Sequence, residues 1–202
     1  MIKRILLILT VFISTQVYSQ NIDIQILRSL NSSRPQPSDN FFKFASNTNN
    51  AIILGVPITI GIVGIIKHDD KILKNAYLIS AASVINFGVT YSLKYSINRK
   101  RPFETYSDII KKSDGGSPSF PSGHASEAFA TATMLSLEYP KWYVIVPSYL
   151  WAGSVGYSRM DLGVHYPSDV LGGMIIGAGS AFLTYKANKW LNKVQKKKHE
   201  LL

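Results

Sequence analysis

The sequence predicts an all-α fold, a polytopic membrane helix bundle formed by one domain. Four runs contain no charged residue: 51–66, 75–93, 142–157 and 170–185. A fifth run, 122–137, carries only His124 and Glu127. Core helices of soluble proteins usually keep a polar face, so these runs indicate membrane spans. A soluble all-helical core is the alternative, and the modest mean hydropathy of +0.08 leaves it open.

Residues 1–19 have the layout of a secretory signal peptide. Lys3 and Arg4 precede a charge-free apolar run over 5–17, and Ser19 suits a small-residue cleavage site. The run is shorter than the roughly 20 residues that a spanning helix needs. We therefore expect cleavage after Ser19, with an uncleaved anchor as the alternative.

Residues 20–50 are predicted to lie at the membrane surface as an interfacial N-terminal segment. Ile22, Ile26 and Leu30 form a short apolar face, and a turn at Pro35 and Pro37 ends it. The helix-bundle domain then covers residues 51–190. Within it, the glycine pattern of 172–179 is typical of close helix packing in lipid.

The charges between the runs predict a topology. If Asn21 is outside, the turns at 67–74 and 138–141 are cytoplasmic. The last run then leads to a basic cytoplasmic tail, residues 191–202, as positive charge near a span favours the inside. The loop 98–116 is also basic, but this topology places it outside. Its positive charge therefore needs an explanation other than membrane orientation.

The overall charge of +10 suggests an anionic partner, namely nucleic acid, a membrane surface or a phosphorylated substrate. The sequence has no cysteine, which excludes disulfides, thiolate metal sites and cysteine nucleophiles.

Three polar stretches fall on the same outer side of this topology: 94–102, 118–124 and 158–169. Each has an ordinary structural interpretation. The cations of the first stretch could anchor a helix at the interface. Ser122 could simply cap a helix, and Arg159 could pair with Asp161 at the surface.

Together the three stretches indicate a site for a phosphoryl group. Lys94 and Arg101 are seven residues apart and share one face if the helix continues. His165 and Asp169 are four apart, so the carboxylate can orient the imidazole. His124 begins a helix, where backbone N–H groups favour an anion.

The same residues resemble a known three-part signature. The chain reads K-x6-R-P at 94–102, P-S-G-H at 121–124 and S-R-x5-H-x3-D at 158–169. This resembles the type 2 phosphatidic acid phosphatase superfamily, which also includes bacterial class A acid phosphatases and vanadium haloperoxidases. The resemblance extends over about residues 40–187.

The resemblance implies a role for each matching position. His165 would be the nucleophile and form a phosphohistidine, Asp169 would orient it, and His124 would be the general acid. The phosphoryl oxygens would be bound by Lys94, Arg101, Ser122, Gly123 and Arg159. The resemblance implies no metal, no cofactor and no nucleic-acid partner, and the basic outer loop would serve the anion site.

The charge-free runs favour the membrane branch, which acts on lipid phosphates. Candidate substrates are undecaprenyl diphosphate-like lipids, phosphatidylglycerol phosphate, phosphatidic acid and lipid A, with the first preferred. We expect a multi-pass protein of the bacterial inner membrane with its active site facing the periplasm. The alternatives are a soluble periplasmic acid phosphatase, a vanadium haloperoxidase and an inactive binding protein.

Overall fold

The computed structural model describes residues 22–31 and 38–199. The predicted signal peptide and the turn at Pro35 and Pro37 lie outside these residues. Residues 22–31, called here the N-terminal segment, are helical over 22–30. The later elements are α2 (Asp39–Lys67), α3 (Asp70–Ile97), α4 (Pro102–Thr105), α5 (Gly123–Glu138), α6 (Trp142–Asp161) and α7 (Pro167–His199). No strand occurs in the described residues, and the predicted all-α fold is confirmed.

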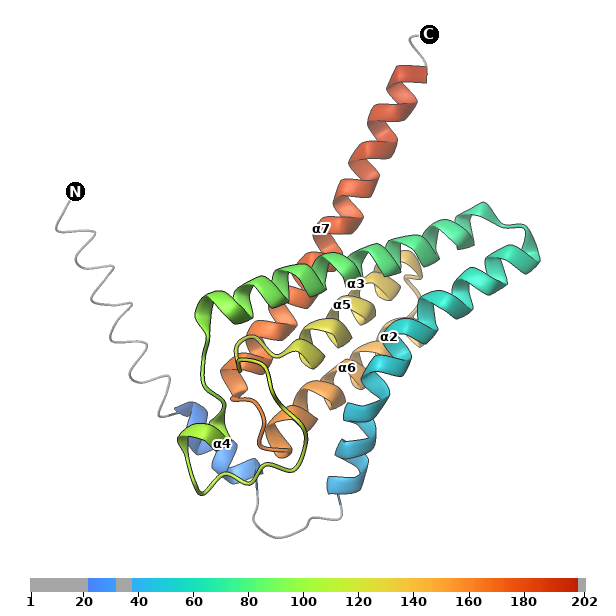
Figure 1. Cartoon of the computed structure of the whole chain (residues 1–202). Helices are drawn as coiled ribbons and strands as arrows, with labels where there is room; N and C mark the ends of the chain where they lie inside the picture. Colours follow the sequence, from blue (N-terminus) through green and yellow to red (C-terminus); the bar gives the residue numbers. More distant parts are fainter. Residues whose placement is uncertain (1–21, 32–37, 200–202) are drawn as a thin grey trace, which may run out of the picture.

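Helix α5 lies at the centre of the bundle and packs against α2, α3, α6 and α7 (Figure 1). Four of its alanines are fully buried: Ala125, Ala128, Ala130 and Ala132. Small side chains let neighbouring backbones approach closely, which is how helices associate where no water drives them together. The short apolar helix therefore becomes the core around which the long helices are arranged.

The glycines of α7 make the closest of these contacts. A Cβ atom on Gly173 would lie 2.5 Å from the Ser122 carbonyl oxygen, and one on Gly177 would lie 2.0 Å from that of Ser126. Only glycine permits such an approach. The close packing expected from the glycine pattern of 172–179 is present at these two positions.

The outer surface of the bundle is strongly apolar. Large side chains are exposed on every long helix, including Ile66, Val84, Leu150 and Leu183. Three described segments are long and apolar enough to cross a membrane: Asp39–Lys67, Asp70–Thr105 and Pro167–Lys197. All five predicted runs form helices. However, α5 has only 16 residues and α6 has 20, and neither is among the three candidate spans.

Two expected boundaries fall inside helices. Helix α2 begins at Asp39, so residues 39–50 are helical and continue directly into the apolar run. Helix α7 continues to His199 through the expected start of the tail, and its last turns project beyond the bundle (Figure 1). In both places the sequence lacks the glycine or proline that would end a helix.

The N-terminal segment contacts the rest of the protein through a face other than the one with the predicted apolar spacing. Ile22 and Ile26 are exposed, whereas Ile24 and Leu27 are buried against Ile109 and Tyr166. The segment thus packs on the loops of the protein itself, which the spacing of its own apolar residues could not reveal.

The three polar stretches are gathered at one end of the bundle. Figure 1 shows the end of α3, the start of α5 and the connection from α6 to α7 close together, with the N-terminal segment beside them. The α2–α3 and α5–α6 turns lie at the opposite end. This arrangement agrees with the alternation of sides in the predicted topology.

Candidate active site

Hydrogen bonds to backbone carbonyl oxygens tie the three stretches to one another. The Ser122 N–H donates to the Asp169 carbonyl oxygen over 2.9 Å, joining the start of α5 to that of α7. Lys94 Nζ donates to the Pro118 carbonyl oxygen over 2.7 Å. Arg101 Nη1 donates to the Val164 carbonyl oxygen over 2.9 Å. These hydrogen bonds join the segments that carry the predicted site residues into one cluster.

Arg101 reaches this cluster from a loop and not from a helix face, so the expectation of a continuing helix was wrong. Helix α3 ends at Ile97 because Asn98 adopts the left-handed conformation, with φ of 48°. Asparagine tolerates this conformation better than most residues. The Arg101 guanidinium then bends to the Ser117 carbonyl oxygen, 2.8 Å from Nε. A Cβ on Gly115 would lie 2.4 Å from Nη1, so a larger residue at this position would require the guanidinium to shift.

His165 and Asp169 are in contact, although His165 precedes the helix. Helix α7 begins at Pro167, a favoured residue for a first helical position. The distance from His165 Nδ1 to Asp169 Oδ2 is 3.5 Å. Since the carboxylate approaches Nδ1, Nε2 is the ring nitrogen available to a reacting group.

Asp169 is held on both oxygens. Oδ2 accepts hydrogen bonds from Ser119 Oγ at 2.5 Å and from the Tyr166 N–H at 2.9 Å. Oδ1 accepts one from Arg99 Nη1 at 2.6 Å. The carboxylate is fully buried, and these donors compensate for the loss of water. It is thereby kept ionised and fixed in place.

Burial determines the protonation state of His165, which is only 2% exposed. Desolvation lowers the pKa of His165 to about 3, and the neighbouring Asp169 offsets only part of that effect. The imidazole is therefore neutral at pH 7. A neutral imidazole is the form that can attack phosphorus.

His124 is the second residue of α5 and is half-buried. Ser122 occupies the N-cap position before it, but its side chain makes no capping hydrogen bond. Ser122 Oγ is buried with no hydrogen-bond partner in the described part of the chain. Gly123 lies beside Lys94, whose Cε would be 3.7 Å from a Cβ at that glycine.

Arg159 is 3% exposed and does not pair with Asp161, so its interpretation as half of a surface pair is wrong. Nη1 donates to Ser46 Oγ on α2, and Nη2 donates to the Asp114 carbonyl oxygen over 3.4 Å. Arg159 Nε is buried without a partner among the described residues. Buried donors usually need a hydrogen-bond partner, so Arg159 Nε and Ser122 Oγ are groups that could donate to the oxygens of an anion.

Sequence reasoning missed several residues around the site. Ser119 contacts both Asp169 and His165, the latter at 3.4 Å between Oγ and Nδ1. From the sequence, Arg99 is only one of the cations that could anchor a helix at the interface, and Asp23 belongs to no motif. Ser119 lies two residues before Pro121 of the P-S-G-H motif, which is the signal that could have indicated it. No pattern in the sequence connects Asp23 to the site.

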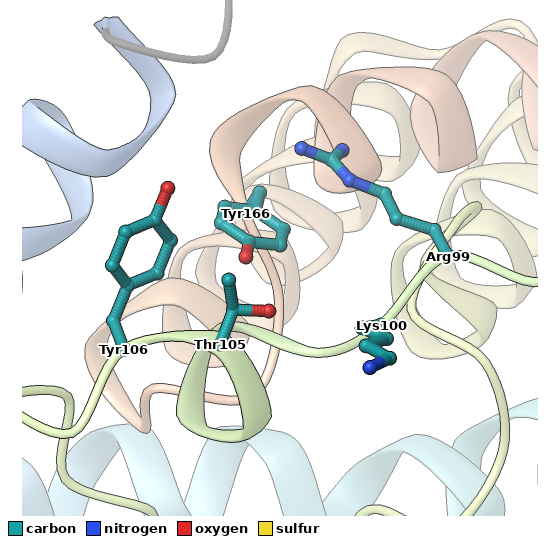
Figure 2. Close-up of a pocket in the computed structure, with 5 residues that line it drawn as sticks. All are labelled: Arg99, Lys100, Thr105, Tyr106 and Tyr166. Atoms are coloured by element: carbon teal, nitrogen blue, oxygen red, sulfur yellow. The ribbon is translucent and has the colours of Figure 1, made fainter.

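A small pocket of about 170 Å³ lies beside this cluster, between α4 and the start of α7 (Figure 2). Its lining consists of Arg99, Lys100, Thr105, Tyr106 and Tyr166. The Arg99 guanidinium lies over the Tyr166 ring, 4.0 Å from its centroid.

The fold and the site together define a helical membrane phosphatase, and comparison with known proteins identifies its family. Residues 75–193 match the PAP2 superfamily model, more than half of the chain. The chain belongs to the PAP2 superfamily, as its resemblance to the type 2 phosphatidic acid phosphatases had indicated.

Two curated relatives illustrate the similarity. The chain is 30% identical over 188 residues to an undecaprenyl-diphosphatase of Sulfolobus acidocaldarius, covering 88% of this chain and 85% of that protein. It is 35% identical over 88 residues to a lipid A 4'-phosphatase of Bacteroides thetaiotaomicron. This second match covers 44% of the chain and only 39% of the relative.

Two crystal structures share the fold. LpxE of Aquifex aeolicus superposes with a TM-score of 0.69 and 28% identity, over 82% of this chain and 95% of that one. A transmembrane PAP2-type phosphatidylglycerolphosphate phosphatase of Bacillus subtilis gives 0.72 and 25%, over 85% and 87%. The second is named as a transmembrane PAP2-type phosphatase. With the family match and the three candidate spans, the chain is accordingly a membrane protein and a phosphatase that acts on lipid phosphates.

Proposed function

We propose that the protein hydrolyses a phosphate ester or diphosphate of a membrane lipid, without a metal, through a phosphohistidine. The observation that carries this proposal is the His165–Asp169 pair beside two buried, unsatisfied polar groups, Ser122 Oγ and Arg159 Nε. These two groups and the cations around them suit the oxygens of a phosphoryl group.

The proposed reaction has two steps. His165 Nε2 attacks phosphorus, a P–N bond forms, and the P–O bond to the lipid breaks as His124 donates a proton to the leaving oxygen. Water then attacks the phosphohistidine, His124 takes its proton, and the P–N bond breaks to release phosphate. Lys94, Arg101 and Arg159 stabilise the charge on the phosphoryl oxygens in both steps.

Undecaprenyl diphosphate-like lipids are the preferred substrates. The curated relative that aligns over most of both chains is named as an undecaprenyl-diphosphatase. Lipid A phosphates are the second candidate, supported by the more local match to the lipid A 4'-phosphatase. The site is proposed to face the periplasm from the inner membrane, where such a lipid can enter from the outer leaflet.

The test is phosphate release by the full chain in detergent, assayed across undecaprenyl diphosphate, phosphatidylglycerol phosphate, phosphatidic acid and lipid A. His165→Ala should abolish release and the acid-labile phosphoenzyme, whereas His68→Asn, in the distant α2–α3 turn, should not. Vanadate should inhibit and EDTA should not. Near-normal turnover by His165→Ala, or EDTA inhibition reversed by a metal, would refute the mechanism.

A further inference from the structure

Arg99 lies on the side of Asp169 away from His165 and is shared between two carboxylates. Its Nη1 donates to Asp169 Oδ1 over 2.6 Å, and its Nη2 donates to Asp23 Oδ2 over 3.0 Å. Stacking on Tyr166 keeps the guanidinium plane in place (Figure 2). The position of this guanidinium therefore depends on Asp23 as well as on Asp169.

Asp23 also holds the first turn of α7, the helix that carries Asp169. It accepts hydrogen bonds from the Ser168 N–H, at 2.8 Å, and from Ser168 Oγ. Ser168 Oγ in turn accepts from Arg99 Nη1 at 2.7 Å. A carboxylate at a helix N-terminus is stabilising because it satisfies unpaired N–H groups and the helix dipole. Asp23 is 5% exposed, so these contacts are shielded from water.

The other residues of the N-terminal segment are packed and hydrogen-bonded to the protein, which holds Asp23 beside Ser168 and Arg99. Ile24 and Leu27 are buried, and Asn31 Nδ2 donates to the carbonyl oxygens of Ile110 and Asp161, both at 2.9 Å. Asn31 Oδ1 accepts from the Ile110 N–H at 2.8 Å. The segment thus joins the two loops that hold Arg101 and His165.

We infer that Asp23 is a positioning residue for the reaction, acting through Arg99 on the Asp169–His165 pair. This inference rests on the proposed function. A guanidinium binds a single carboxylate through both oxygens when geometry allows. With one arm held by Asp23, Arg99 takes only Oδ1 of Asp169 and leaves Oδ2 facing His165. Without Asp23, Arg99 can bind both carboxylate oxygens of Asp169. Asp169 Oδ2, which lies 3.5 Å from His165 Nδ1, would then be drawn away from the imidazole.

The test compares Asp23→Asn with Asp108→Asn in the full chain in detergent. Asp108 pairs with Arg28 of the same segment, with 2.6 Å between Nε and Oδ2, but that pair is half-exposed and does not contact Asp169. Asp23→Asn should lower kcat roughly 10- to 100-fold, the scale of loss for a misplaced catalytic group, with KM within about twofold. Asp108→Asn should leave both constants within about twofold of the wild type.

A double-mutant cycle separates positioning from a merely structural contribution. If Asp23 acts through Arg99, adding Asp23→Asn to Arg99→Gln should lower kcat no further. Multiplicative losses in the double variant would overturn the inference, and so would a wild-type kcat in Asp23→Asn. An inactive wild type would instead refute the proposed function.

A second variant covers the case in which Asp23→Asn is not recovered folded. Ser168→Ala removes the hydroxyl that bridges Asp23 and Arg99 beside their direct ion pair, and it keeps all the charges. It should lower kcat several-fold with KM unchanged, and a kcat equal to that of the wild type would overturn the inference.

Discussion

Asp169 shows how much of a catalytic residue's environment comes from distant parts of the chain. Its spacing from His165 is visible in the sequence, but its other side-chain partners are Ser119 and Arg99, 50 and 70 residues away. Arg99 in turn binds Asp23, 76 residues from it. A buried carboxylate needs several donors, and these came from segments without a shared motif.

The neutral state of His165 predicts how stability depends on pH. Its folded pKa of about 3 lies below the value of about 6.5 for an unfolded histidine. Between these values the unfolded state binds more protons, so stability should fall as pH decreases from about 6.5, by at most about 1.4 kcal/mol per pH unit. Above about pH 6.5 this contribution is fully present.

Thermal unfolding in detergent between pH 4.5 and 8 measures this effect. In His165→Asn, the melting temperature should fall less steeply than in the wild type as the pH is lowered below about 6.5. His68→Asn, at an exposed turn position with φ of 51°, should keep the wild-type shape. Parallel profiles for the wild type and His165→Asn would show that His165 is not buried in its neutral form.

At the scale of elements, the contact between α5 and α7 places the two histidine-bearing stretches together. Gly173 and Gly177 let α7 lie against the backbone of α5 at Ser122 and Ser126. The first turns of both helices then meet, which is where the Ser122 N–H donates to the Asp169 carbonyl oxygen. Close helix packing is thus a condition for forming the site.

Gly177→Ala should destabilise the protein, because its Cβ would lie 2.0 Å from the Ser126 carbonyl oxygen. Overpacking of this kind costs about 1–3 kcal/mol. Gly179→Ala is the matched control, since nothing lies within 4 Å of its Cβ and alanine favours a helix by about 0.5–1 kcal/mol. The melting temperatures of the two variants should move in opposite directions, and equal melting temperatures would contradict the close contact.

At the scale of the whole molecule, the alternation of helices brings three polar stretches to one end of an apolar bundle (Figure 1). The proposed topology places this end outside the cytoplasm. Because the chain has no cysteine, single cysteines can report on each side without a background.

Lys111→Cys, in the loop before α5, should react with a membrane-impermeant maleimide in intact spheroplasts. Lys71→Cys, at the opposite end at the start of α3, should react only after the membrane is permeabilised. Both positions are exposed, so a difference in labelling reports sidedness. The reverse pattern would show that the site faces the cytoplasm.

The sequence alone determined the helical class, the five runs that form helices and the motif residues that the fold gathers at one end of the bundle. Charge-free runs can be recognised directly along the sequence. A three-part motif can be recognised from the order and spacing of its residues alone. The expectation that failed was local: Arg101 does not lie on α3, because Asn98 ends that helix.

Only the tertiary structure decided how the site is supported. The contacts of Asp23, Arg99 and Ser119 with α7 and Asp169 depend on the folding of loops and on a helix far away in the chain. Such contacts leave no periodic signal, because each is a single polar pair brought together by packing. The motif thus specified the reacting groups, and the tertiary structure specified the side chains that hold these groups in position.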